Sequence, residues 1–534
     1  MRPLGRRLLF AVEILVLSAL ILATRCANYP DVFIGDHIYF TDADCYARMT
    51  RVRLCAQHPG LILRHHIFEN YPQGTTPHTT APLDYAILFF SYLLRPFSSR
   101  PIDMAGALIS PVFAIVAGAF LCFWARRMKL AYRWAMLLLF ALSPILVHGT
   151  ELGRPDHQSL AILLVLVGLC ADVVALESAE ARWSIVSGSA WGLAIWVTAY
   201  EPLILLGLST VAGLAFLRNP QTEAKSASLT VAIADVFRSG RTKWIVCGAI
   251  LLCALLIERR MLSVSMFVRD PIFRNWSRTI GELGSISFLN PIWLKWLGWL
   301  IAAAPFLVLL SMRTRFNRMP VTILFLLVIT FGLTMWQARW GYFLALLFVL
   351  ALPALLKSVP SRLVAWLLFV ISLWPILQDW DEKLWPNEFT GARQDERRHE
   401  AVELHEMSIS LISAQRQPFL APWWLSPAIT YWSGQPGVAG SSHESISGIA
   451  DSARFFLAQD PSEALDILRR RGVEWVIAYD AGRVQQTSSA ILGKAGSDRS
   501  LALILDQRPT RAPAFLTLFF QNGTVKIFEV TNKW

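Results

Sequence analysis

The sequence has few charged residues and no paired cysteine motif. Only 16% of its 534 residues are Asp, Glu, Lys or Arg, against roughly 25% in a typical globular protein. This deficit excludes a chain that is soluble throughout, and the apolar content excludes a disordered one. The 7 cysteines include no CxxC pair, so they predict neither a metal-binding nor a disulfide framework. Cys45 and Cys55 could pair in an extracytoplasmic loop, but free thiols are the preferred interpretation.

Apolar residues are abundant instead. They make up 54% of the chain, which also contains 21 Trp. The length alone would allow three or four soluble domains, but this composition predicts a polytopic membrane protein. The 49 Lys and Arg exceed the 38 Asp and Glu by 11. In a membrane protein such an excess reports topology and contacts with anionic lipids, so we expect membrane lipids, and no nucleic acid, as partners.

Eleven segments are long and apolar enough to cross a membrane, which needs about 20 residues each. The first, 8–24, follows basic residues and has no cleavage site, so it predicts an uncleaved helix that starts in the cytoplasm. The segment 83–97 has only about 15 residues, which suits an interfacial or re-entrant helix. The region 184–217 is either two spans or one bent unit. The other predicted spans are 103–125, 131–149, 159–177, 184–200, 202–217, 243–258, 291–311, 320–336, 340–356 and 362–379.

Eleven spans, rather than twelve, put the basic loops inside the cell, as the positive-inside rule requires. The loops 25–102, 150–158 and 259–290 then lie outside. The chain divides into a transmembrane domain, 1–379, and an extracytoplasmic domain, 380–534. The loop 259–290 breaks the charge rule, because five arginines lie outside: Arg259, Arg260, Arg269, Arg274 and Arg278. An anionic ligand such as a phosphate, or lipid head groups, would account for them.

The last 150 or so residues predict a soluble α/β domain. Asp460 precedes Pro461 at a helix start, and Gly472 ends that helix. The following VEWVIAYD is typical of a buried strand, and LTLFFQ-NG-TVKIFEV predicts a hairpin with a two-residue turn at Asn522-Gly523. The segment 395–413 is expected to form an amphipathic helix.

Acidic residues occur in three of the outer loops. They are Asp42 and Asp44 in TDADCY, Asp156 in GRPDHQ, and Glu282 in TIGE. Carboxylates brought together at a membrane surface repel each other unless a cation compensates them. Oxygen ligands suit Mg²⁺ or Mn²⁺, which would stabilise a departing phosphate as a Lewis acid. Each motif alone is weak evidence for a metal site. The prediction depends on the order of the three motifs along the chain and on their predicted location on the same face of the membrane.

These features resemble the catalytic subunit of oligosaccharyltransferase, of the single-subunit bacterial and archaeal type, in the GT-C glycosyltransferase class. The matching elements are the Asp and helix at 44–49, the Gly-x-x-Asp element at 153–158, the TIxE motif at 279–282, a Trp-Trp pair at 423–424, ITYWSGQP at 429–436 and ALDILRRRGVEWVIAYD. The resemblance covers most of the chain, and TIGE in its context is the most specific part.

The resemblance implies an α-helical, polytopic GT-C bundle with an extracytoplasmic α/β domain, and transfer of a glycan from a polyprenyl-linked donor to a protein or other acceptor. It also implies that Asp44, Asp156 and Glu282 hold a divalent metal, with His157 or Gln158 as a further candidate ligand. Arg339 matches an arginine that contacts the carrier's phosphates. The implied substrate-binding residues are Arg339, Thr279, Trp423 and Trp424.

The chain also departs from the family. WWDYG, which reads the Ser or Thr of an N-x-S/T acceptor, is replaced by Trp423-Trp424-Leu425-Ser426-Pro427, so N-glycosylation of that sequence is in doubt. Gln158 replaces an acidic or His ligand, and the family has thirteen spans. Two alternatives stay open: a GT-C enzyme of the O-mannosyl- or aminoarabinose-transferase type using a polyprenyl-monophosphate sugar, and a lipid-linked-sugar flippase or exporter. A prokaryotic plasma membrane, with a cytoplasmic N-terminus, is the expected location.

Overall fold

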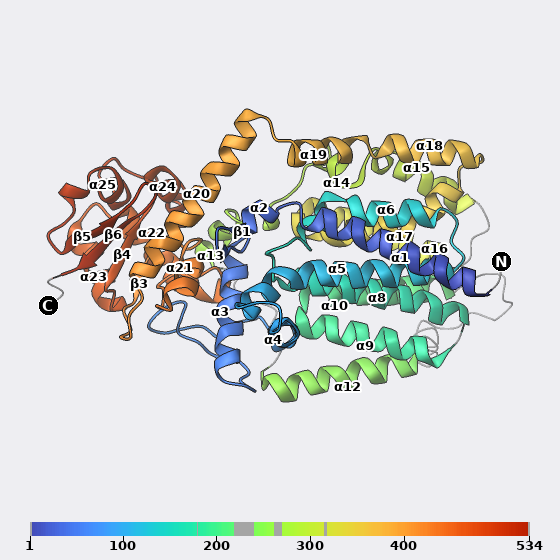
Figure 1. Ribbon diagram of the computed structural model, residues 1–534, viewed down its shortest axis with the longest axis horizontal. Helices are drawn as coiled ribbons and strands as arrows, with labels where there is room; N and C mark the ends of the chain where they lie inside the picture. The colour runs from blue at the N-terminus through green and yellow to red at the C-terminus, as the bar shows by residue number, and fades with distance from the viewer. Residues whose placement is uncertain (1–2, 179, 218–239, 261–269, 314–317, 532–534) are drawn as a thin grey trace.

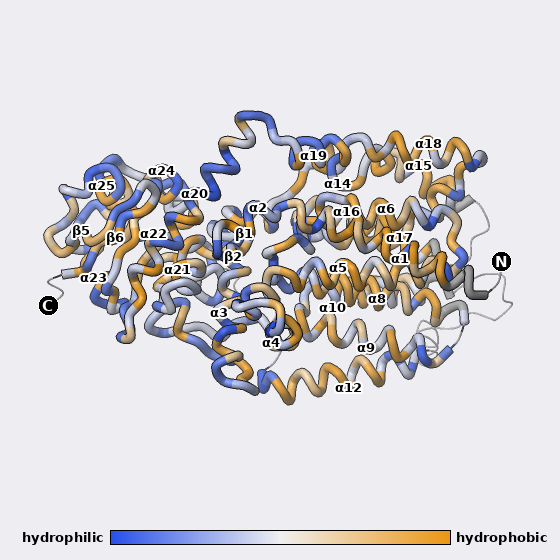
Figure 2. Tube along the Cα trace, viewed as in Figure 1, coloured by the Kyte–Doolittle hydropathy of each residue, from blue (hydrophilic) through white to orange (hydrophobic). Residues whose placement is uncertain are grey.

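The structure is a computed structural model that describes residues 3–178, 180–217, 240–260, 270–313 and 318–531. Apolar helices lie side by side in a bundle, and a smaller domain with a sheet lies beyond one end of it (Figure 1). The N-terminus lies at the opposite end of the bundle from this domain. Hydrophobic residues follow the bundle helices, whereas polar residues gather in the smaller domain (Figure 2).

Five helices are long and apolar enough to span a membrane, over Leu8–Arg25, Pro101–Arg127, His157–Ala175, Ala338–Lys357 and Arg362–Leu384. Several shorter apolar helices accompany them. The multi-span character is thus confirmed, whereas the number eleven stays a prediction. The uninterrupted bundle helices are α1 (Pro3–Arg25), α5 (Pro101–Arg127), α8 (His157–Ser178), α9 (Ala181–Val197), α10 (Tyr200–Leu217), α12 (Arg241–Glu258), α16 (Arg318–Trp336) and α17 (Gly341–Lys357).

Three predicted spans are interrupted. The breaks separate α6 (Arg133–Leu142) from α7 (Pro144–His148), α14 (Ile292–Leu297) from α15 (Leu300–Arg313), and α18 (Arg362–Ser372) from α19 (Trp374–Leu384). Pro144 and Pro375 lack the N–H that would continue a helix. Gly298 has a φ of 75°, and a Cβ there would collide with the Ser372 carbonyl. The region 184–217 forms two helices, because Thr198 is extended.

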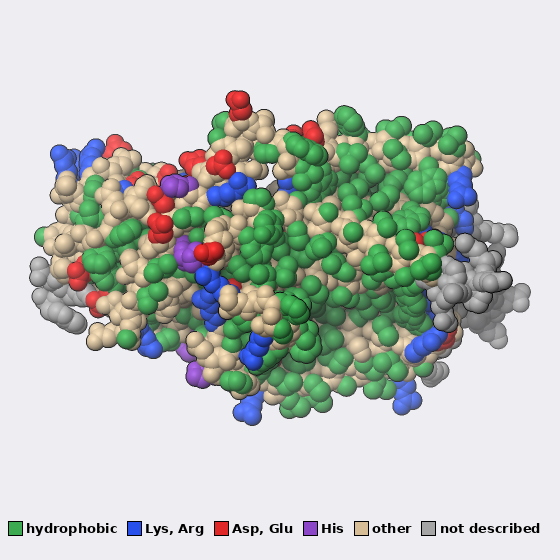
Figure 3. All heavy atoms as spheres, in the orientation of Figure 1, with side chains coloured by type: hydrophobic (Ala, Val, Ile, Leu, Met, Phe, Trp, Pro, Cys, Tyr) green, Lys and Arg blue, Asp and Glu red, His purple; other side chains and the backbone are tan. Residues whose placement is uncertain are grey.

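The helix α17 is buried along almost its whole length, since α6, α15 and α16 pack around it. A helix enclosed in this way is apolar on every side. The outer helices α1, α12 and α18 instead expose large apolar side chains, among them Leu15, Leu256 and Leu363. Apolar side chains also cover most of the bundle's visible face (Figure 3). Such a surface suits contact with lipid.

The acidic residues inside the bundle are compensated. Glu13 of α1 contacts Arg133 at 2.8 Å and Arg126 at 3.4 Å. Asp172 of α8 lies 2.8 Å from Lys243 of α12. A charge within a membrane is costly unless it is paired, so these contacts tie neighbouring helices together.

The segment 25–102, predicted to lie outside the cell, is largely structured. It forms α2 (Tyr29–Val32), a small hairpin of β1 (Phe33–Ile34) and β2 (His37–Ile38), α3 (Ala43–Gln57) and α4 (Ala81–Leu94). The last of these is the short apolar segment expected near 83–97, and it packs against α5 and α3. Its buried Asp84 is held by Arg48 and Arg51 of α3, each at 2.8 Å.

The C-terminal domain is built on a four-stranded sheet with the order β3-β4-β6-β5. The strands are β3 (Phe419–Leu420), β4 (Trp475–Ala478), β5 (Leu516–Gln521) and β6 (Lys526–Val530), and only the β3–β4 pair is parallel. The helices are α20 (Glu388–Ser410), α21 (Ser426–Ser433), α22 (Ile446–Leu457), α23 (Pro461–Arg471), α24 (Ala481–Leu492) and α25 (Leu501–Gln507), with the 3₁₀ turn η5 (Pro509–Arg511).

The predicted helix start and end at Asp460 and Gly472 and the predicted buried strand are confirmed, whereas the predicted turn and the predicted start of the amphipathic helix are displaced. Asp460 caps α23 through the N–H of Ser462, and Gly472 ends the helix with a φ of 61°. All four residues of β4 are buried. The predicted turn is displaced by one residue: the loop is Gly523-Thr524, because Asn522 is still bonded to Val525 and its side chain accepts the N–H groups of Thr524 and Val525. Helix α20 begins at Glu388, where the Asn387 side chain caps it, seven residues before the predicted start.

Candidate active site

The first acidic motif lies at the start of α3. Asp42 caps this helix by accepting the N–H of Cys45 at 3.0 Å, and its second oxygen lies 2.6 Å from Arg154. Asp44 lies in the first turn, where the Ser441 side chain of the C-terminal domain hydrogen-bonds to it. The cap thus fixes the direction in which α3 presents Asp44. Cys45 and Cys55 are free thiols, as preferred.

The second motif is a tight turn before α8. Gly153 has a φ of 75°, and a Cβ there would lie 2.7 Å from Val32, so only glycine fits. Its carbonyl accepts the N–H of Thr41 at 3.0 Å, which joins this turn to the first acidic motif. Asp156 accepts the His157 N–H at 2.7 Å, and its Oδ1 lies 2.7 Å from His157 Nδ1. His157 therefore fixes the Asp156 carboxylate.

The third motif follows a short helix that is anchored in the C-terminal domain. Asp270 caps α13 (Pro271–Ser277), and the buried Trp276 packs edge-on against Trp423, with 5.6 Å between the ring centroids. The Thr279 hydroxyl donates to the Trp276 carbonyl at 2.7 Å. The turn η2 (Gly281–Leu283) then carries Glu282. Trp276 and Thr279 thus hold the segment that carries the Glu282 carboxylate in place.

Two polar side chains hold Glu282 next to Asp156. The Tyr342 hydroxyl donates to Glu282 Oε1 at 3.1 Å. The Gln158 amide lies between the two carboxylates, 3.5 Å from Glu282 Oε2 and against Asp156. The Gln158 NH₂ group can donate to only one of the two acids, and its carbonyl oxygen then faces the other, so Gln158 contacts both carboxylates but does not join them by hydrogen bonds.

The electrostatics of the site agree with this convergence. The Asp44 side chain is exposed to water, but the surrounding protein atoms reduce the hydration of its carboxylate. The negative charges of Asp42 and, more weakly, Asp156 also repel the ionised form. Together they raise the pKa of Asp44 to about 8. Burial, followed by Asp156, also raises the pKa of Glu282. Burial opposes ionisation of Asp156, but the neighbouring His157 and Arg154 outweigh it and hold the pKa of Asp156 below its usual range.

A divalent cation fits this site in charge and in donor type. Asp44, Asp156 and Glu282 offer only oxygen ligands, and their mutual repulsion is what a cation would relieve. They approach one another, but among the described residues they do not form a group whose ligand atoms all lie within 4.8 Å. That condition is met by His78, His443 and Glu444, which the sequence analysis did not single out. Their separation along the chain leaves no spacing pattern to find.

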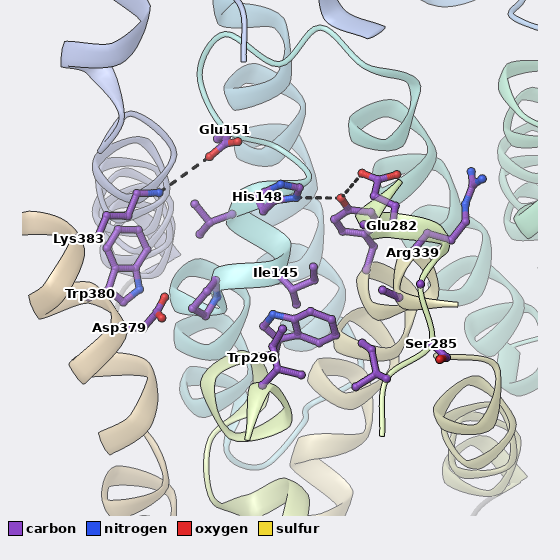
Figure 4. Close-up of a pocket in the computed structure, with 18 residues that line it drawn as sticks. Ile145, His148, Glu151, Glu282, Ser285, Trp296, Arg339, Asp379, Trp380 and Lys383 are labelled. Atoms are coloured by element: carbon purple, nitrogen blue, oxygen red, sulfur yellow. Dashed lines mark hydrogen bonds and ion pairs between the residues drawn. The ribbon is translucent and has the colours of Figure 1, made fainter. Parts of the chain in front are cut away.

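Arg339 lies beside these acids in η3 (Ala338–Trp340). Its Nη2 is 2.5 Å from Glu201 at the start of α10, and Glu282 and Asp156 are also close enough to act on its charge. A cavity of about 580 Å³ opens next to it. Figure 4 shows Glu282, Arg339 and His148 along one side of this cavity and Trp380 with Lys383 on the other. Sequence reasoning did not assign Tyr342 or Ser441 to the site, and it considered Glu201 only as an acidic residue near or within a span.

The tryptophan pair and the arginine-rich loop have structural contacts. Trp423 and Trp424 meet edge to face, and neither is among the residues that line the cavity. Arg260 is engaged by Glu258 at 3.2 Å and by backbone carbonyls, whereas Arg274 and Arg278 are exposed. Arg269 lies outside the described residues. The anionic ligand expected for this loop stays a prediction.

The chain was compared with known proteins. No protein-family model matches it. A segment of 159 residues is 26% identical to dolichyl-phosphooligosaccharide-protein glycotransferase 1 of Archaeoglobus fulgidus, and covers 29% of this chain and 26% of that protein. The match thus spans about a quarter of the length of this curated relative.

Solved structures match over much more of the chain. The Archaeoglobus fulgidus oligosaccharyltransferase AglB, in complex with an inhibitory peptide and a dolichol-phosphate, has a TM-score of 0.66 at 13% identity, covering 93% of this chain and 72% of that one. The oligosaccharyltransferase of the same organism in complex with Zn and sulfate gives 0.65 at 12% identity, covering 95% and 78%. ArnT from Cupriavidus metallidurans bound to undecaprenyl phosphate gives 0.54 at 14% identity, covering 98% of both chains.

These comparisons agree with the resemblance found in the motifs. The fold is shared over nearly the whole chain, whereas the identity is low. The protein is therefore a multi-span membrane protein with the GT-C-like fold, structurally and distantly in sequence similar to the archaeal oligosaccharyltransferase AglB and to ArnT.

Proposed function

We propose that this protein is a membrane glycosyltransferase that moves a glycan from a polyprenyl-(di)phosphate carrier to an acceptor on the outer face of the membrane. One observation carries the proposal: Asp44, Asp156 and Glu282, from three distant segments, converge beside Arg339. Carboxylates whose mutual repulsion and burial perturb their pKa values, next to a cationic side chain and a cavity, are typical of a catalytic site. Their positions match the three acidic motifs found in sequence.

Two of the similar structures support the proposed donor class. The AglB structure holds a dolichol-phosphate and the ArnT structure holds undecaprenyl phosphate, so both bind a polyprenyl phosphate. Arg339 is the side chain we assign to the carrier's phosphate, because guanidinium pairs well with phosphate oxygens. Glu201, at 2.5 Å, orients the guanidinium for this contact.

We assign Asp44, Asp156 and Glu282 as the residues that hold a divalent cation, Mg²⁺ or Mn²⁺. When bound, it would supply Lewis-acid stabilisation of the leaving phosphate. His157 keeps Asp156 ionised, and Tyr342 and Gln158 aim Glu282. Asp44 and Glu282 also orient the acceptor nucleophile, for which the cavity beside Glu282 offers room. Transfer by inversion then needs only one displacement at the sugar.

The acceptor is a protein or another molecule. The AglB complex contains a peptide, but the present chain has Leu425 and Ser426 where the WWDYG motif has Asp and Tyr, and Leu425 precedes α21 without a carboxylate. We therefore do not assign the N-x-S/T sequence to it. We place the site on the extracytoplasmic side of a prokaryotic plasma membrane, with the N-terminus in the cytoplasm.

A second candidate is transfer from a polyprenyl-monophosphate sugar. The fold similarity to ArnT, over 98% of both chains, favours it. A flippase or exporter is favoured less, because Glu13 and Glu201, the acids near or within spans, are both engaged in ion pairs.

The test is a transfer assay. Purified protein is incubated with a pool of lipid-linked oligosaccharides or polyprenyl-monophosphate sugars, candidate acceptors, and Mn²⁺ or a chelator, and products are identified by mass spectrometry. We expect transfer that needs the cation. Asp44→Ala and Glu282→Ala should each lower the rate about 10²–10³-fold, as expected when transition-state stabilisation is lost. Asp31→Ala removes a half-exposed carboxylate of the same outer loop and should leave the rate unchanged. Retained transfer by both catalytic-site variants would reject the assignment.

A further inference from the structure

His78, His443 and Glu444 form a compact cluster at the junction of the two parts of the molecule. His78 precedes α4, whereas His443 and Glu444 lie in η4 (His443–Ser445) of the C-terminal domain. Among the described residues, these three are the one group of three or more His, Cys, Asp or Glu side chains whose ligand atoms all lie within 4.8 Å of one another.

The distances suit a four-coordinate ion. His78 Nδ1 lies 2.9 Å and His443 Nε2 3.3 Å from Glu444 Oε1. The two imidazole rings have centroids 4.6 Å apart and are tilted by 31°. Bonds of about 2.0–2.1 Å in a tetrahedral site place neighbouring ligand atoms about 3.3 Å apart. Only small adjustments would therefore admit an ion between these groups.

Two ring nitrogens that face one carboxylate can be joined to it by protons or by one shared cation. Two imidazoles and a carboxylate are the ligands that zinc and neighbouring transition metals prefer, whereas Mg²⁺ and Ca²⁺ prefer oxygen alone. We propose that His78, His443 and Glu444 bind a divalent transition metal of the zinc class. The half-exposed His78 side chain, with 39% of its surface open, leaves a route for the ion and a coordination position for water.

The surroundings hold the ligands in place. The N–H of His78 donates to Glu444 Oε1 at 2.6 Å, so backbone and side chain fix the same carboxylate. Arg260 donates to the carbonyls of Pro77 and Thr79, on either side of His78. Ligands that are already oriented lose little freedom when the ion binds.

The site differs from the proposed catalytic one in residues and in donor type, and it does not rest on the proposed function. The proposed metal site is nevertheless connected to the proposed catalytic site through residues 441–443. Ser441, two positions before His443, hydrogen-bonds Asp44, and Ser442 donates to Glu69 at 2.9 Å. A metal at His443 would thus clamp the segment 441–444 of the outer domain onto the outer loop 25–102, and so position Ser441 at Asp44.

The experiment measures bound metal in the full-length protein. The chain carries Asp156→Asn and Glu282→Gln, which weaken the proposed catalytic cation site. It is stripped with a chelator, dialysed against Zn²⁺ and analysed by elemental mass spectrometry. We expect one equivalent of zinc, which His78→Asn and His443→Asn each remove. His399→Asn is the matched control, since His399 contacts Glu403 at 3.3 Å but belongs to no three-ligand group in the described chain; it should keep the equivalent.

Two further measurements distinguish loss of the metal site from misfolding of a variant. Zn²⁺ should raise the thermal-unfolding midpoint of the Asp156→Asn/Glu282→Gln protein and of the His399→Asn control, and should not raise that of Glu444→Gln. Co²⁺ in place of Zn²⁺ should give visible absorption typical of tetrahedral nitrogen and oxygen ligands. Absence of bound zinc from the parent protein, or an equivalent that survives both His78→Asn and His443→Asn, would overturn the proposal. Transfer activity plays no part in either outcome, so the proposed function is tested separately.

Discussion

Single aspartates contribute to stability with opposite signs in this protein, according to the charges that face them. Asp84 is buried between Arg48 and Arg51, whereas Asp44 faces Asp42, Asp156 and Glu282. Removal of one member of such a buried ion cluster destabilises the fold, because it leaves the remaining charge uncompensated. A carboxylate among carboxylates is strained in its ionised form, which is the condition that a cation or a substrate relieves.

The raised pKa of Asp44 predicts a stability profile. Between the unfolded pKa of about 4 and about 8, the folded protein retains a proton that the unfolded chain has released. Stability therefore falls as pH rises through this window. Asp44→Asn should raise the thermal-unfolding midpoint at pH 8 in a chelator, and the gain should vanish towards pH 4. Calorimetry in detergent measures it.

Asp84→Asn is the opposite control. At position 84 the change from Asp to Asn leaves the two buried arginines, Arg48 and Arg51, uncompensated. This should lower the free energy of unfolding by about 3–5 kcal/mol and lower the thermal-unfolding midpoint at neutral pH. A midpoint for Asp44→Asn that is equal to or below that of the unmodified protein at pH 8 would show that the carboxylates do not repel each other as described.

Arg339 has two possible partners, the carrier phosphate and Glu201. Arg339→Gln should lower the transfer rate about 10²–10³-fold if the guanidinium stabilises the leaving phosphate. Because Arg339→Gln also leaves Glu201 unpaired, the double variant Arg339→Gln/Glu201→Gln separates the two roles. We expect the double variant to stay inactive. Recovery of transfer would mean that Arg339 serves only to compensate Glu201.

At the scale of the element, the short helix α13 determines where Glu282 lies. It has few residues of its own to stabilise it, so its position depends on Trp276, which is buried against Trp423, Ala439 and Ile491 of the C-terminal domain. The segment that carries Glu282 is thus held by the C-terminal domain rather than by the bundle alone.

Trp276→Ala tests this support. Loss of a buried tryptophan typically costs about 3–5 kcal/mol, and here we expect it to free α13 and the TIGE segment. Transfer should fall, and limited proteolysis should cut near residues 270–283. Trp385→Ala, which removes a side chain that is 72% exposed, should change neither. Intact protease resistance in Trp276→Ala would contradict this role.

Local chemistry made several elements predictable. Asp460, Gly472 and the apolar run around residue 475 suffice for a helix, its end and a buried strand, because caps and apolar runs act over a few residues. Glu282 and Asp156 were indicated differently, by the order and predicted common side of the acidic motifs and by the resemblance of TIGE and GRPDHQ to family motifs. The metal and substrate roles of the nine site residues stay predictions.

Long-range contacts were not predictable. His78 and Glu444 are 366 residues apart, and Tyr342 reaches Glu282 only because α17 packs where it does. The interruptions at Pro144 and Gly298 were also missed, since apolar composition does not distinguish a continuous span from two half-helices. Packing partners, rather than local propensity, decide these features.

At the scale of the whole molecule, the C-terminal domain and the three acidic motifs share one end of the bundle, opposite the N-terminus (Figure 1). The turn between α5 and α6, which lies at the N-terminal end of the bundle (Figure 1), carries the basic residues Arg126, Arg127, Lys129 and Arg133. The positive-inside rule then predicts a cytoplasmic N-terminus and an extracytoplasmic site.

Reporter fusions test this orientation. Alkaline phosphatase fused after residue 534 should be active, because the enzyme needs an oxidising extracytoplasmic compartment, and green fluorescent protein at the same place should be dark. Fusions after Tyr132, in the turn between α5 and α6, should give the reverse pattern. Identical behaviour of the two fusion sites would reject the topology.

The ion pairs of Glu13 also constrain how the chain enters the bilayer. Glu13 and Arg133, which lie 2.8 Å apart, are separated by 120 residues. During synthesis, α1 therefore reaches the membrane long before its partners on α5 and α6 have left the ribosome. Until those helices arrive, the nascent first helix carries an uncompensated acid, so its docking into the bundle must follow the insertion of α5 and α6.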